Sequence, residues 1–151
     1  MAQGPAASEE GARAAQGGGE GGEPQIVAGL ELRGLDHVTV TAPAELEAEV
    51  IEWYERVLGL EQIEKPEGAG EKGAWFSLGG SQLHLSHDPH NPPRRAHFAI
   101  RVGDFNSAVD HLRGHGCHIE QAKEIRGRHR FFTRDPAGNR IEFFTLDEGA
   151  D

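Results

Sequence analysis

Three histidines and one glutamate lie at matching places in two halves of the sequence. His37 and His97 are 60 residues apart, and His84 and Glu142 are 58 residues apart. Imidazole nitrogens together with a carboxylate oxygen suit a borderline divalent metal such as Ni, Zn, Co, Fe or Mn. Two histidines and one carboxylate that leave positions open can also hold Fe(II) for oxygen chemistry. We therefore expect these four side chains to bind one divalent ion, whose identity among these metals stays open.

The alternation of side chains along strands predicts that these four residues share one surface. In the segment 34–41, His37 falls on the same face as Thr39 and Thr41, while valines occupy the other face. The same alternation separates polar from apolar residues in 82–86, 96–102 and 140–145. The apolar faces must be covered, and helices are the available partners. The polar faces are then expected to form a concave surface that carries all four candidate ligands.

The elements that position these residues occur twice in the same order. The first half is expected to contain a strand (34–41), a helix from Pro43 to Gly59, and strands near 60–65, 74–78 and 82–86. The second half is expected to contain a strand (96–102), a helix capped by Asp104, and strands at 118–121, 130–134 and 140–145. Both halves read βαβββ, which indicates an internal duplication. We predict an α+β domain over 34–146, built from module one (34–87) and module two (95–146).

The composition limits the location and partners of the protein. The chain has 151 residues, with 25 acidic and 15 basic side chains and a formal net charge of -10. This balance argues against a surface that tracks phosphates of nucleic acid or anionic lipid. A single cysteine, Cys117, fits a reducing compartment, and no apolar run approaches the roughly 18 residues of a membrane span. No signal-peptide pattern is visible, so we expect a cytoplasmic protein that binds neither nucleic acid nor a membrane.

The first residues form a segment of different character. Residues 1–24 are rich in Gly, Ala and Glu and contain no aromatic side chain. Such a segment cannot bury enough apolar area to offset its chain entropy. We therefore expect a disordered tail over 1–28, outside the duplicated domain.

Several segments resemble the vicinal oxygen chelate superfamily, which includes glyoxalase I, fosfomycin-resistance transferases, bleomycin-resistance proteins and extradiol dioxygenases. The matching segments are LDHVTVTAP (35–43), WYERVLGL (53–60), AWFSLGGSQLHL (74–85), AHFAIRV (96–102) and RFFTRDPAGNRIEFF (130–144). The resemblance implies two βαβββ modules that form a cupped, eight-stranded mixed sheet with the helices on its convex side. It also implies that the ligands come from the first and fourth strands of each module. These are His37 and His84, then His97 and Glu142.

The resemblance implies metal-dependent chemistry on a small molecule with adjacent oxygens, of lyase, isomerase or transferase type. The ion would act as a Lewis acid that stabilises an oxyanion, while Glu142 or His84 moves a proton. Glyoxalase I usually has Glu or Gln where this chain has His84, and other branches need only three ligands. His84 is therefore either the fourth ligand or a group beside the metal. Arg101 and Arg140 lie on the same expected face and are candidates to bind a substrate carboxylate or phosphate.

Two other functions stay open alongside this first hypothesis. An extradiol-type Fe(II) dioxygenase would use His37, His97 and Glu142. A non-enzymatic drug-binding protein, like those that sequester bleomycin, would need no metal ligands. The resemblance also implies a homodimer, in which each site is built within one chain or shared between two.

Overall fold

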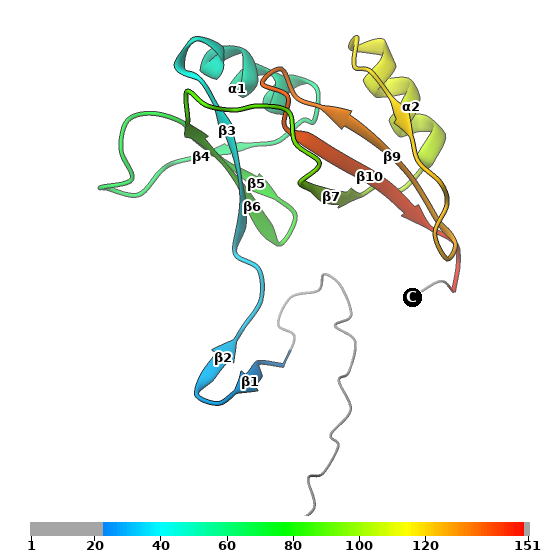
Figure 1. The fold of residues 1–151 in the computed structure, drawn as a ribbon, viewed down its shortest axis with the longest axis horizontal. Helices are drawn as coiled ribbons and strands as arrows, with labels where there is room; N and C mark the ends of the chain where they lie inside the picture. Colours follow the sequence, from blue (N-terminus) through cyan, green and yellow to red (C-terminus); the bar gives the residue numbers. More distant parts are fainter. Residues whose placement is uncertain (1–22, 150–151) are drawn as a thin grey trace, which may run out of the picture.

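The computed structural model describes residues 23–149 (Figure 1). Module one contains β3 (His37–Ala42), a 3-10 turn (Ala44–Leu46), α1 (Glu47–Arg56), β4 (Gln62–Ile63), β5 (Ala74–Leu78) and β6 (Ser81–His87). Module two contains β7 (His97–Arg101), α2 (Phe105–Gly114), β8 (Glu120–Gln121), β9 (Arg128–Arg134) and β10 (Arg140–Leu146). The order of elements in both modules confirms the predicted βαβββ duplication.

Each module folds its four strands into a sheet of its own. The strand orders are β3-β6-β5-β4 and β7-β10-β9-β8. In each sheet the first strand of the module pairs in parallel with the last, and the other pairings are antiparallel. The α+β class is confirmed. The strands of one chain form two four-stranded sheets instead of one continuous sheet of eight, so β3 and β7 are both edge strands.

Local chemistry explains where the helices begin. The Asp104 carboxylate accepts a hydrogen bond from the Ser107 backbone N–H at 2.7 Å and so caps the first turn of α2. The helix α1 follows Pro43 and places Glu47 and Glu49 in its first turn, where the positive end of the helix dipole favours carboxylates. Glu47 also accepts a hydrogen bond from the Gly73 N–H at 3.0 Å, which ties the start of α1 to the loop before β5.

One hydrophobic core joins both modules, and it forms on the apolar faces that the alternation predicted. The buried side chains come from both helices and both sheets. They are Val40, Ala42, Val50, Tyr54, Val57, Ala74, Phe76, Leu83, Leu85, Val109, Leu112, Phe131, Ile141 and Phe143. The two helices lie on the same side of the pair of sheets (Figure 1). The polar faces of the strands therefore point away from this shared core.

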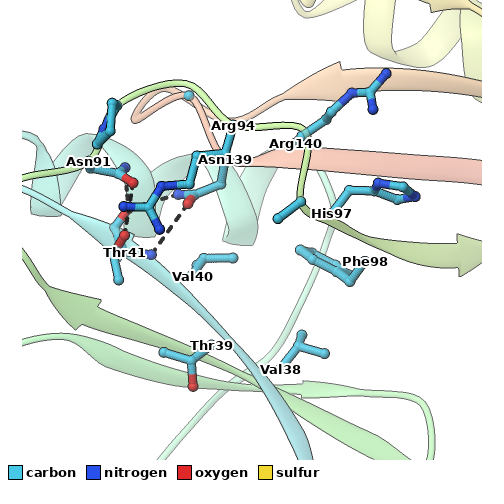
Figure 2. A pocket seen from close by; sticks show the side chains of 13 residues that line it. Val38, Thr39, Val40, Thr41, Asn91, Arg94, His97, Phe98, Asn139 and Arg140 are labelled. Atoms are coloured by element: carbon cyan, nitrogen blue, oxygen red, sulfur yellow. Dashed lines mark hydrogen bonds between the residues drawn. The ribbon is translucent and has the colours of Figure 1, made fainter.

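Hydrogen bonds fix the two modules against each other. The buried Tyr54 hydroxyl of α1 donates to Asp135, in the turn between β9 and β10, at 2.7 Å. The side-chain amides of Asn91 and Asn139 each donate to the Thr41 carbonyl at 2.8 Å (Figure 2). These contacts satisfy polar groups at the seam and hold the end of β3 against the second module.

A hairpin precedes the duplicated domain. β1 (Gln25–Val27) and β2 (Leu30–Leu32) pair antiparallel and form a separate two-stranded sheet. This differs from the expectation of a disordered segment up to residue 28, because a two-residue turn at Ala28 and Gly29 lets the short flanking strands pair. The rest of that expected tail, residues 1–22, lies outside the described residues. None of the described helices is long and apolar enough to cross a bilayer.

Candidate functional site

The first pair of expected ligands lies on the polar face of sheet one. His37 on β3 and His84 on the neighbouring β6 stack their rings with centroids 3.8 Å apart. Trp75, the cross-strand partner of His84 on β5, stacks on His84 at the same centroid distance of 3.8 Å. His84 is only 6% exposed. Three flat rings thus form one continuous stack on the outward face of module one.

The hydrogen bonds of this pair decide which ring nitrogens can bind a cation. His37 Nδ1 donates to the Asp36 carboxylate at 2.7 Å, which leaves Nε2 as the nitrogen with a free lone pair. His84 Nε2 donates to the Gln82 side-chain oxygen at 2.8 Å, which leaves Nδ1 as the free nitrogen of the neutral ring. Burial, and after it the neighbouring His37, lowers the pKa of His84, which favours the neutral form of its ring.

The second pair lies on the polar face of sheet two. His97 Nε2 and Glu142 Oε2 are 3.0 Å apart, and the Glu142 side chain is only 9% exposed. His97 Nδ1 lies 3.0 Å from the Arg95 carbonyl oxygen. Metal-binding histidines usually donate a hydrogen bond from Nδ1–H to an oxygen such as a backbone carbonyl, which leaves Nε2 free to bind the metal. The donor types and their orientation therefore fit one side of a divalent-metal centre.

Arginines surround this second pair. Arg130 on β9 places Nη1 3.6 Å from the other Glu142 oxygen. The Arg140 guanidinium lies 3.6 Å above the Phe132 ring and contacts Glu120 at 3.3 Å. Arg101 is exposed on β7, in register with Phe144 of β10. Both arginines expected to bind substrate thus lie on the same sheet face as His97 and Glu142, and Arg140 already has an acidic partner.

The four expected ligands form two separate pairs within one chain. Across residues 23–149, no three of them bring donor atoms within 4.8 Å of one another. The reason is that β3 and β7 are edges of different sheets that share a core on their apolar faces. Figure 2 shows Val38 directed toward Phe98, whereas Thr39 points away from it and the His97 ring points away from β3. Within the described part of one chain, the four side chains therefore form two separate pairs, His37 with His84 and His97 with Glu142.

A different group of side chains meets the distance criterion for a metal site. Glu124, His129 and Asp147 bring their donor atoms within 4.8 Å of one another. The His129 ring lies between the two carboxylates, 3.5 Å from Glu124 and 2.9 Å from Asp147. Strand alternation places His129 on the face of β9 opposite to Arg130. This exposed group was not expected from the sequence, because Glu124 and Asp147 lie in loops outside the strand pattern.

The cavity in Figure 2 lies on the seam between the two modules. It has a volume of about 390 Å³ and is lined by residues that include Val38, Phe98, Asn139 and His97. Among the four expected ligands, His97 alone borders it. This cavity is therefore distinct from a centre that would use all four.

Comparisons with known proteins agree on the family. Residues 34–143 match the model of the Glyoxalase/Bleomycin resistance protein/Dioxygenase superfamily. A crystal structure from Bacillus anthracis, assigned to the glyoxalase family, is 34% identical, covers 77% of this chain and 97% of its own, and superposes with a TM-score of 0.71. No match was found among curated proteins.

More distant structures share the fold. Lactoylglutathione lyase from Agrobacterium tumefaciens is 20% identical, with 74% of this chain and 92% of that chain covered and a TM-score of 0.60. A fosfomycin resistance protein from Listeria monocytogenes is 13% identical, with 79% and 98% covered and a TM-score of 0.64. With the matched domain spanning both modules, the chain belongs to the glyoxalase/bleomycin resistance protein/dioxygenase superfamily, the vicinal oxygen chelate fold.

Proposed function

We propose that the protein is a homodimeric, divalent-metal enzyme that acts on a small molecule with adjacent oxygens. Each metal centre would combine His37 and His84 of one chain with the partner's His97 and Glu142. The observation that carries this proposal is the division of the donors into two outward-facing pairs, each next to an unpaired sheet edge. If the β3 edge of one chain lay against the β7 edge of its partner, His37 and His84 would come close to the partner's His97 and Glu142. Edge strands have unpaired backbone groups and are suited to such contacts between chains.

The family resemblance and the donor chemistry support a metal that polarises two substrate oxygens as a Lewis acid. In that centre, Asp36 orients the His37 ring, and the Arg95 carbonyl orients the His97 ring. The buried His84 would bind the ion through Nδ1, because its Nε2 donates to the Gln82 side-chain oxygen. Trp75 covers the His84 ring and excludes water from one of its faces.

Metal analysis of untagged protein tests the first part of the proposal. We expect about one divalent ion per chain, and strong loss of the ion in the Glu142→Ala variant. His87→Ala is the matched control, because His87 lies exposed at the end of β6 and belongs to neither pair. Protein that stays metal-free after incubation with Ni, Zn, Co, Fe and Mn would refute the metal-dependent function.

A mixed dimer tests whether the sites are shared. His37→Ala and Glu142→Ala chains are unfolded together, refolded and loaded with metal. Shared sites give each heterodimer one intact centre, so random mixing restores about a quarter of the wild-type metal content. Sites within single chains restore none. Light scattering on the wild type must show a mass of twice 16.4 kDa.

Extradiol dioxygenase activity is the alternative that uses the same residues. Anaerobic loading with Fe(II), followed by exposure to a panel of catechols and oxygen, distinguishes it from Lewis-acid chemistry. Ring cleavage would favour the dioxygenase. Tight binding of a glycopeptide drug by metal-free protein would instead favour a binding function.

A further inference from the structure

The outward face of sheet two is rich in arginine, although the chain as a whole carries a net charge of -10. Strand register places five arginines and two glutamates on the face that holds His97. These charged residues are Arg101, Arg128, Arg130, Arg134, Arg140, Glu120 and Glu142. The face therefore has an excess of three positive charges. An acidic protein with one such local excess concentrates anions at that surface.

The outward face of sheet one has the opposite character. Apart from the imidazoles, the strand residues that share the face of His37 and His84 are uncharged, and the Asp36 carboxylate lies beside His37 at the start of β3. The uncharged residues are Thr39, Thr41, Ile63, Trp75, Ser77, Gln82 and Ser86. In the proposed dimer, a substrate would lie between sheet one of one chain and sheet two of its partner. It would meet rings, hydroxyls and an amide on the first face and guanidinium groups on the second.

Three of the five arginines, Arg128, Arg130 and Arg140, lie over aromatic rings. The Arg128 guanidinium lies 4.1 Å above the Phe144 ring, and the Arg130 guanidinium lies 5.5 Å from the Phe132 ring. Stacking on a ring leaves the edge of the guanidinium plane, which carries its N–H groups, available to an acceptor. Arg130 is anchored further by the hydrogen bond of its Nε to the Lys123 carbonyl at 3.1 Å. Its side chain is 20% exposed.

Arg130 is the best placed of these groups to bind a substrate. Its Nη1 is 3.6 Å from Glu142, longer than a good hydrogen bond, so the guanidinium is near the expected metal centre without being saturated by it. Arg140, by contrast, already contacts Glu120. A planar guanidinium next to a metal centre matches the geometry of carboxylate, phosphate and phosphonate groups.

We propose that the substrate of this enzyme is an anion, whose carboxylate, phosphate or phosphonate group binds to Arg130 with Arg128 as a second contact. This inference rests on the proposed function for the position of the reacting oxygens. The anion subsite itself needs only sheet two of one chain. It is therefore present whether the metal centre is shared between chains or not.

Titration of metal-free protein with inorganic phosphate tests the subsite directly. Binding is followed by calorimetry and by the NMR signals of the arginine Nε–H groups. We expect saturable binding that shifts the Arg130 signal. Arg130→Gln should weaken it about tenfold, and Arg128→Gln should weaken it less. Arg56→Gln is the matched control, because Arg56 is an exposed arginine on α1 that pairs with Glu52.

Three outcomes would overturn the inference: no saturable phosphate binding, an Arg130→Gln variant that binds as the wild type does, or equal weakening by Arg56→Gln, which means non-specific attraction. Arg130→Lys retains the positive charge but loses the planar, two-donor geometry of the guanidinium, so this variant should bind phosphate with intermediate affinity. Intermediate affinity would also show that the loss in Arg130→Gln does not come from misfolding. Metal binding is measured on a second portion of each preparation after it has been loaded with metal. Phosphate binding without metal binding would overturn the proposed function alone, and metal binding without phosphate binding would overturn this inference alone.

Discussion

Replacement of Tyr54 by phenylalanine removes a single buried oxygen atom that links the two modules. The Tyr54 hydroxyl donates to Asp135 at 2.7 Å, and the two residues are 0% and 4% exposed. Phenylalanine fills the same space, so packing in the core is retained. The change therefore isolates the hydrogen bond between α1 and the β9–β10 turn.

The expected cost follows from the other contacts of Asp135. Its carboxylate keeps hydrogen bonds from the Ala137 N–H at 2.9 Å, the Asn139 N–H at 2.9 Å and the Asn139 side-chain amide at 2.8 Å. The Asp135 carboxylate therefore keeps three hydrogen-bond donors in the Tyr54→Phe variant. A hydrogen bond to a charged group contributes about 1.5–3 kcal/mol, and we expect the free energy of unfolding to fall by about 2 kcal/mol. For a domain of this size, that lowers the Tm by about 4–8 °C.

The cost should also depend on pH. Burial raises the pKa of Asp135 above its ordinary value of 3.8, and the hydrogen bond from Tyr54 opposes that rise. A carboxyl with a raised folded-state pKa contributes stability below the unfolded-state value, and this contribution is lost as pH rises through the folded-state pKa. Loss of the Tyr54 hydroxyl raises the Asp135 pKa further, so the variant loses more stability on going from acid to neutral pH.

Urea unfolding of both proteins at pH 4 and pH 7 measures the effect, followed by the fluorescence of Trp53, whose ring lies 5.0 Å from that of Tyr54. The deficit of Tyr54→Phe should be larger at pH 7. A double-mutant cycle with Asp135→Asn separates the pair from other effects of each change. Equal stability of variant and wild type, or a larger deficit at pH 4, would refute this account of the contact.

Four further substitutions test the fold. Gly73→Ala should destabilise the fold strongly, because Gly73 has φ +80° and an added Cβ would lie 2.0 Å from the Leu85 carbonyl oxygen. Gly79→Ala, at φ +58° with free space around it, should lower the free energy of unfolding by only about 1–2 kcal/mol, as measured by chemical denaturation. Phe76→Ala should remove about 3–5 kcal/mol, since Phe76 is fully buried; a loss below that of Gly79→Ala would contradict its place in the core. Asp104→Ala should lower the Tm above pH 3.8, and this effect should shrink below pH 3.8. The reason is that hydrogen bonding from Ser107, by its side chain and then by its backbone N–H, lowers the pKa of Asp104, and the stability from such a carboxylate is lost as pH falls; a pH-independent deficit would exclude the cap as its cause.

Much of the fold was predictable from the sequence because its signals are local. Side-chain alternation is a property of each strand, so the apolar faces of Val40, Leu83 and Ile141 follow from the order of residues alone, and all three side chains are buried. The duplication made the assignments consistent, because the same order of elements appears in both halves. The N-cap at Asp104 is also a local signal that the structure confirms.

The arrangement of the site depends on contacts that no local pattern encodes. Asp36 and the Arg95 carbonyl orient the rings of His37 and His97, and neither was expected in that role. The arginine face of sheet two emerges only when β7, β9 and β10 are placed in register, because alternate residues of three distant segments must be read together.

The sequence by itself determined that His37, His84, His97 and Glu142 would lie on the polar faces of their strands. Only the tertiary structure decided how far those faces come together. The shared core and the Tyr54–Asp135 contact fix the two sheets through their apolar sides, so β3 and β7 remain free edges and the donors divide into two pairs. Which face a side chain occupies follows from the backbone geometry of one strand, whereas the packing of one sheet against another depends on the whole chain.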